Sequence, residues 1–193
     1  MEKDRLLAMT DGVVAIIITI MVLELKAPAG EDLQSLHALW PVFFAYVLSF
    51  VYVAIYWNNH HHYFHLVPRV NGAVLWANFH LLFWLSLIPF STAWLGEHAF
   101  EPIPTALYGI SLLTPALAWV IMQKVIIRMQ GDSSRLKAVL GRDVKGTVSP
   151  FLYLAGILFS FVAPWAALLC YLAVTFLWLV PDKRIEKMVA HDG

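Results

Sequence analysis

The chain is poor in cysteine and in charge, and both shortages narrow what it can be. A single cysteine, Cys170, occurs among the 193 residues, so no disulfide framework within the chain can hold it together. Charged residues make up 13% of the chain, and Lys plus Arg balance Asp plus Glu at 13 each. A neutral chain lacks the basic excess that binding to nucleic acid requires.

The sequence also lacks the short motifs of several common functional classes. It contains no Walker phosphate loop, no GxGxxG dinucleotide loop, no HExxH zinc motif, and no Ser, His and Asp in the order of a hydrolytic triad. The TVGYG carbonyl filter of ordinary potassium channels is absent as well. We therefore expect a protein that is not an enzyme and that holds no metal or cofactor.

What the sequence has in abundance is long apolar runs. Hydrophobic residues make up 60% of the chain, against about 45–50% in soluble domains. Six runs approach the length of about 20 residues that crosses a bilayer: 8–25, 36–57, 73–95, 103–127, 148–163 and 165–180. These runs predict an all-α integral membrane protein, with residues 1–193 forming a single domain of six transmembrane helices. The last two runs are short and meet at Pro164, which predicts a tight helical hairpin.

The basic residues predict how such a domain lies in the membrane. With six spans, both termini and every Lys and Arg except Lys26 fall on one side. By the positive-inside rule this side is cytoplasmic, in a cell (inner or plasma) membrane. The other side carries five acidic residues, which form either an acidic mouth that concentrates cations or an ordinary solvated loop: Glu24, Glu31, Asp32, Glu97 and Glu101.

The first apolar run contains an intramembrane acid, Asp11, six residues after Arg5. At about 100° per residue these two side chains do not face each other, so we expect Asp11 to pair with another helix. About 140° away from Asp11 on the same wheel lies an apolar stripe with one hydroxyl, free to face lipid, another helix or a pore: Met9, Gly12, Ile16, Thr19, Ile20 and Leu23.

Histidines gather where the second run ends, in WNNHHHYFH (57–65), and one more, His80, lies within the third. We expect these imidazoles to hydrogen-bond with nearby Trp and Asn side chains, and His60 to pair with Asp11. His61 and His65 have the i,i+4 spacing that can ligate a metal, but no further ligand accompanies them. A second interpretation is a membrane redox protein that binds haem or quinone through these intramembrane imidazoles.

The stretch RLLAMTDGVVAIIITIMVLEL (5–25) resembles the R-x-x-x-F-S-D signature that opens the first helix of the transmembrane protein 175 family of potassium channels. Arg5 and Asp11 match this signature, whereas Met9 and Thr10 stand where the family has Phe and Ser. WNNHHHYF resembles the family's W-x-x-H-(H)-x-x-F stretch, and the third run resembles its third helix. These matches lie in the first 96 residues, and they include Trp57, His60, Phe64, Asn78 and Pro89.

The resemblance implies a homotetramer of six-helix subunits in a lipid bilayer, with the first helices lining a central pore for potassium ions. It assigns the hydrophobic constriction to Ile16, a part in cation selectivity to Thr19, and further pore positions to Ile20 and Leu23. A polar network that fixes the pore helix is implied at Arg5, Asp11, Trp57, His60 and Asn78. Some relatives also pass protons, so protons and other monovalent cations are possible permeants. A secondary transporter is a third interpretation, although no inverted repeat is visible.

Overall fold

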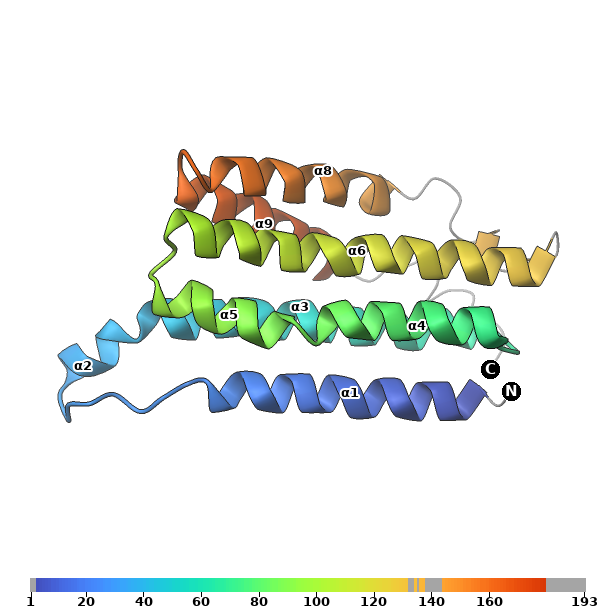
Figure 1. Ribbon diagram of the computed structural model, residues 1–193, viewed down its shortest axis with the longest axis horizontal. Coiled ribbons are helices and arrows are strands. Elements are labelled where there is room, and N and C mark those ends of the chain that lie inside the picture. Colours follow the sequence, from blue (N-terminus) through green and yellow to red (C-terminus); the bar gives the residue numbers. More distant parts are fainter. Residues whose placement is uncertain (1–2, 132–133, 135, 138–143, 180–193) are drawn as a thin grey trace.

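The structure is a computed structural model that describes residues 3–131, 134, 136–137 and 144–179 (Figure 1). This part of the chain is helical throughout its regular elements and contains no strand. Its helices are α1 (Lys3–Leu23), α2 (Leu33–Ala38), α3 (Trp40–His65), α4 (Gly72–Leu85), α5 (Ile88–Glu97), α6 (Pro102–Gln130), α8 (Val144–Phe159) and α9 (Pro164–Leu179).

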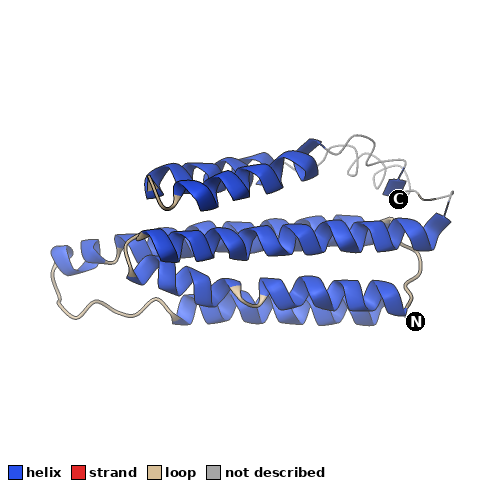
Figure 2. Cartoon of the chain, turned by 45° about the horizontal axis from the view of Figure 1, so that its top comes forward, coloured by secondary structure: helices blue, strands red, loops and turns tan. Residues whose placement is uncertain are grey.

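The long helices lie roughly parallel to one another in one bundle, as both ribbon views show (Figures 1 and 2). α1 packs against α3, α4 and α5, and α6 packs against α4, α5, α8 and α9. In Figure 1, α1 forms one outer edge of the bundle and the α8–α9 pair forms the other. The described part of the chain therefore supports α1 on one side only.

The third apolar run is broken into two helices. α4 ends at Leu85 and α5 begins at Ile88, with Pro89 in its first turn. Proline has no amide N–H, and its ring clashes with the carbonyl four residues earlier, so a continuous helix through Leu85 is disfavoured. The hydroxyl of Ser86 donates to the Phe83 carbonyl at 2.7 Å and so satisfies one carbonyl at the break.

Within the described residues, four helical stretches are long and apolar enough to cross a membrane: Lys3–Leu23, Trp40–His65, Gly72–Glu97 and Pro102–Gln130. The remaining pair, α8 and α9, has 16 residues in each helix, or about 24 Å at 1.5 Å per residue, against a hydrocarbon core of about 30 Å. α8 and α9 form the predicted hairpin, with Pro164 opening α9. The C-terminal basic residues Lys183, Arg184 and Lys187, which contribute to the predicted orientation, lie outside the described residues.

Hydroxyl groups join the helices in the interior. The Ser49 hydroxyl of α3 lies 2.7 Å from the Thr92 hydroxyl of α5 and 2.8 Å from the Tyr108 hydroxyl of α6. Ser91 and Ser111 make a similar contact between α5 and α6 at 2.7 Å. Such bonds between membrane helices contribute about 0.6 kcal/mol each on average, and they fix the mutual register of α3, α5 and α6.

Tyr171 of α9 is fully buried between two glycines, Gly109 on α6 and Gly156 on α8. A Cβ atom at either glycine would overlap the Tyr171 ring. The Tyr171 hydroxyl also donates to the Thr105 carbonyl of α6 at 3.2 Å. The two glycines thus allow the α8–α9 hairpin to sit close against α6.

Candidate functional site

α1 has one side buried in the chain and one side bare. The buried side chains recur every three or four residues, as one face of a helix requires: Leu6, Thr10, Val14, Ile17 and Met21. The bare side carries the predicted stripe, in which 58% of Ile16 and 72% of Leu23 are exposed, and Met9 and Ile20 are exposed too. The described part of the chain thus leaves more than half of the Ile16 and Leu23 side chains uncovered.

Thr19 is the one hydroxyl on the bare side. Its Oγ1 donates to the Ala15 carbonyl one turn earlier at 2.7 Å, and the side chain is exposed. Because the hydroxyl proton is used within the helix, the oxygen lone pairs are left to point outward. Such an oxygen can accept a hydrogen bond from water or replace a water molecule around a cation.

A groove of about 420 Å³ lies between α1 and α5. Its walls are mainly apolar and include Ile16, Ile20 and Phe90, with Glu24 as its charged member. A second hollow of about 230 Å³ adjoins it and is lined by Glu24 and Glu97. The apolar stripe of α1 therefore leads, at the end of the helix, to a region with two carboxylates.

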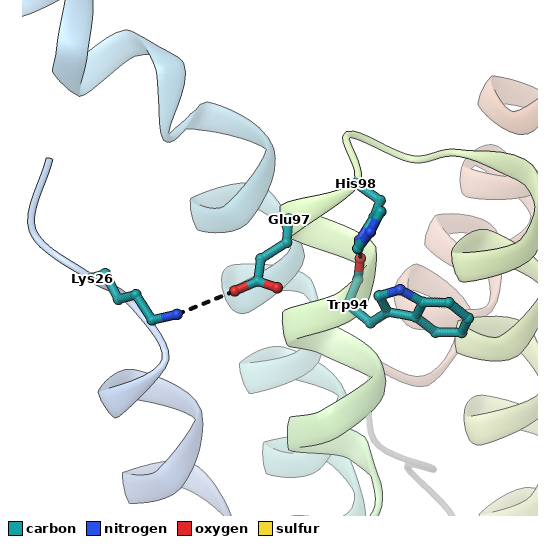
Figure 3. A network of polar contacts seen from close by, with 4 residues as sticks. All are labelled: Lys26, Trp94, Glu97 and His98. Atoms are coloured by element: carbon teal, nitrogen blue, oxygen red, sulfur yellow. Dashed lines mark hydrogen bonds and ion pairs between the residues drawn. The ribbon is translucent and has the colours of Figure 1, made fainter. Parts of the chain in front are cut away.

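An exposed ion pair connects the segment after α1 to the end of α5. Lys26 Nζ lies 3.4 Å from Glu97 Oε1, and both side chains are at least half exposed (Figure 3). Beside this ion pair, His98 follows the last residue of α5, and its Nδ1 lies 3.0 Å from the Trp94 carbonyl one turn earlier. Lys26, the one basic residue predicted on the acidic side of the membrane, thus partly neutralises the charge of Glu97.

Asp32, another of these acids, serves the fold as the N-cap of α2. Its carboxylate accepts a hydrogen bond from the Ser35 amide at 2.7 Å. Hydrogen bonds from the Ser35 side chain and amide hold the pKa of Asp32 below its ordinary value. Asp32 is therefore a carboxylate at neutral pH, and its charge is engaged in capping.

A buried chain of hydrogen bonds joins α1, α3 and α4. Asn78 Nδ2 donates to Thr10 Oγ1 at 2.9 Å, and Thr10 donates to the Leu6 carbonyl at 3.0 Å. His60 Nε2 donates to Asn78 Oδ1 at 2.9 Å, while the His60 ring stacks on Phe64 with centroids 4.4 Å apart. His60, Asn78 and Thr10 are all buried, so this chain of hydrogen bonds fixes the N-terminal half of α1 against its two neighbours.

Asp11 pairs with Trp57 rather than with His60. Trp57 Nε1 donates to Asp11 Oδ1 at 2.8 Å, and both residues are exposed. The expectation that His60 binds Asp11 is wrong because Asp11 follows Thr10 by about 100° around α1, and it is Thr10 that faces the buried His60–Asn78 pair. An interhelical partner for Asp11 was expected and is present.

The five residues of the predicted network thus fall into separate groups. Asp11 and Trp57 form one pair, and His60 and Asn78 form another with Thr10, which the sequence did not single out as a network member. The sequence did offer one indication of this role, because Thr10 stands at the Ser position of the family signature. Arg5 is exposed and makes no hydrogen bond or ion pair with a described residue.

The remaining histidines do not form the site that a haem would need. His60 Nε2 is engaged by Asn78, and His80 Nε2 accepts from Trp84 Nε1 on its own helix at 2.9 Å. The Nε2 atoms of both rings are therefore already hydrogen-bonded to protein side chains, and the redox interpretation finds no support. Among the described residues, no three His, Cys, Asp or Glu side chains converge as metal ligands.

Comparison with known proteins points to one family. Residues 5–89 match the family model described as "Endosomal/lysosomal potassium channel TMEM175". A potassium channel of Chryseobacterium sp. (strain P1-3) is 53% identical over 192 residues, which is 100% of both chains.

A relative of known structure and a vertebrate relative are also similar to this chain. The crystal structure of a lysosomal potassium-selective channel TMEM175 homolog from Chamaesiphon minutus is similar with a TM-score of 0.78 and 28% identity, over 93% of this chain and 97% of that one. The endosomal/lysosomal proton channel TMEM175 of Danio rerio is 25% identical over 68% of this chain, and the match covers 25% of that protein. The residues matched by the family model cover most of α1 and all of α3 and α4, which carry the polar contacts described above.

Proposed function

The chain belongs to the TMEM175 family of potassium channels, and from this premise we propose that it forms a potassium-selective cation channel whose pore is lined by α1. The resemblance drawn from the sequence is thereby confirmed at the level of the family. Membership also makes the chain a multi-pass membrane channel protein rather than an enzyme.

The bare stripe of α1 is the observation that carries the proposal. Ile16, Ile20 and Leu23 are exposed on the side opposite to the packed face, over a length of about 10 Å at 1.5 Å per residue. Four copies arranged around an axis would place four Ile16 side chains at one level. A narrow apolar ring of this kind excludes water and stops ions, and it passes them when it widens.

Thr19 lies within this stripe and supplies its oxygen atoms. In a tetramer four Thr19 hydroxyls would form a ring whose lone pairs point toward the axis, because their protons are donated to Ala15. Such a ring replaces part of the water shell of a potassium ion. It offers fewer oxygens than a TVGYG filter, so we expect a modest preference for potassium over sodium.

The assembly and its membrane placement complete the proposal. We place residues 1–193 in one six-span domain, with the α8–α9 hairpin supplying the last two spans and both termini in the cytoplasm of a cell membrane. The homotetramer is supported by the uncovered face of α1, which a monomer would leave to lipid together with Thr19 and the edge of the groove that contains Glu24. Transport needs no cofactor beyond the permeant ions.

Ion flux into liposomes tests the constriction. Ile16→Ser should raise potassium flux several-fold because a hydroxyl keeps the narrow ring wet. Ile121→Ser is the matched control, since Ile121 is an exposed isoleucine on α6, away from α1. The control should leave flux at the wild-type level. Absence of potassium flux in both wild type and Ile16→Ser contradicts the proposal.

A second substitution pair tests the selectivity of the Thr19 ring. Thr19→Val keeps the side-chain shape and removes the oxygen, so the ratio of potassium to sodium flux should fall. Thr114→Val removes an equivalent hydroxyl, bonded to the Ile110 carbonyl on α6 at 3.0 Å, and should leave the ratio unchanged. Proton flux is measured in the same liposomes, because the Danio rerio relative is named as a proton channel. An unchanged ratio in Thr19→Val rules out the selectivity role.

A further inference from the structure

Two histidines at the end of α3 take no part in the proposed pore. His61 and His65 are both exposed, and their Nε2 atoms lie 3.1 Å apart. His62, between them, points elsewhere, and its Nδ1 lies 2.7 Å from the Asn58 carbonyl. The i,i+4 spacing places the first two rings on one face of the helix, where a single ion can reach both.

The distance between the two nitrogens matches that of a chelate. Imidazole nitrogens bind zinc at about 2.0–2.1 Å, so two of them on one ion lie about 2.9 Å apart at a right angle and about 3.3 Å apart at the tetrahedral angle. The observed separation of 3.1 Å falls between these values. The separation of the two nitrogens therefore needs little change for them to bind one ion together.

We propose that His61 and His65 chelate a divalent transition-metal ion of the zinc, copper or nickel class, which imidazole favours. No third His, Cys, Asp or Glu joins the pair among the described residues, so water completes the coordination. Without metal, one Nε2–H is donated to the other Nε2. On binding, that proton moves through solvent to Nδ1 of the same ring, so both rings bind as neutral imidazoles.

The pair is connected to α1 through Trp57. The indole of Trp57 stacks on His61, with ring centroids 5.9 Å apart and planes inclined by 24°, and it donates to Asp11 on α1. An ion that fixes His61 therefore restrains the side chain that ties α1 to α3. The consequence for conduction, which rests on the proposed function, is that an occupied site reduces the movement of the pore helix.

The positive charge of Lys3 should weaken metal binding at the neighbouring His65. Lys3 Nζ donates to the Phe64 carbonyl at 3.2 Å, and its charge acts on His65. Removing this charge should therefore strengthen metal binding, whereas a site elsewhere on the chain would not respond.

Isothermal titration of the purified, tag-free full-length chain with Zn²⁺ tests the site. We expect one ion per chain, a loss of affinity of about tenfold or more in His61→Gln and in His65→Gln, and wild-type affinity in His62→Gln. Lys3→Gln should bind more tightly than wild type. Melting temperatures check that each variant is folded. The proposal is overturned if wild type shows no saturable binding, if both chelate variants bind as wild type does, or if His62→Gln weakens binding equally.

Potassium flux with and without Zn²⁺ tests the coupling separately. Zn²⁺ on the side of the histidine pair should reduce flux through wild type and leave flux through His61→Gln unchanged. Equal inhibition of the two proteins overturns the coupling. If wild type conducts no potassium at all, the proposed function fails, while the calorimetric result still decides whether the metal site exists.

Discussion

The two sides of α1 are similar in composition and opposite in environment. Ile16 and Ile17 are neighbours of the same type, yet 58% of one is exposed and 3% of the other. In a membrane, an apolar side chain is about as stable against lipid as against another apolar side chain, so hydrophobicity alone does not decide which side of α1 packs against the other helices. The deciding features are specific contacts on one side, above all the hydrogen bond from Asn78 to Thr10.

The largest expected difference between the two sides is seen by truncating each isoleucine in turn. Ile17→Ala should lower the free energy of unfolding by about 2 kcal/mol, because it leaves a cavity in the packed face. Ile16→Ala should leave stability nearly unchanged and alter potassium flux instead. Thermal melting in detergent, followed by liposome flux, checks both. Equal destabilisation by the two variants would mean that α1 has no bare side in the assembled protein.

Much of the fold could be predicted from hydropathy and proline. The break at Ser86 and Leu87 follows from Pro89, and the α8–α9 hairpin follows from Pro164. The ends of helices were predicted less well. α3 runs on to His65, eight residues beyond the predicted apolar run, because hydropathy reports contact with lipid whereas the helix continues wherever its backbone hydrogen bonds do.

The candidate site was predictable where a single helix determines it. Periodicity alone gave the stripe at Ile16, Thr19 and Leu23, since these angles depend only on α1. The partner of Asp11 was not predictable in this way. Trp57 and His60 lie three residues apart on α3, and the rotation and depth of α3 beside α1 decide which of them meets the carboxylate.

A smaller effect is expected at the contact between Asp11 and Trp57, which holds the edge of the bare side. Trp57→Phe removes the donor to a charged acceptor and should cost about 1 kcal/mol. Asp11→Asn should cost less, because its amide oxygen still accepts from the indole. Trp84→Phe is the control, since Trp84 donates to His80 within one helix. If Trp84→Phe lowers the melting temperature as much as Trp57→Phe does, the hydrogen bond between α1 and α3 adds nothing to stability.

The smallest effect on stability is expected beyond the C-terminal end of α1, where Lys26 and Glu97 form an exposed ion pair. Such pairs contribute about 0–1 kcal/mol, so Lys26→Gln and Glu97→Gln should both change the melting temperature little. Their effects on potassium flux should be opposite. Lys26→Gln makes the region around Glu24 more negative and should raise flux, whereas Glu97→Gln should lower it.

The salt dependence of potassium flux tests whether the opposite effects of Lys26→Gln and Glu97→Gln are electrostatic. At low ionic strength both changes should be visible, and near 1 M salt, where the screening length is about 3 Å, they should vanish. Flux that responds equally to the two variants, or not at all, would make these acids an ordinary solvated loop. Opposite changes that salt removes would instead establish an acidic mouth at the end of the bare stripe, because breaking the ion pair is common to both variants and only the sign of the remaining charge differs.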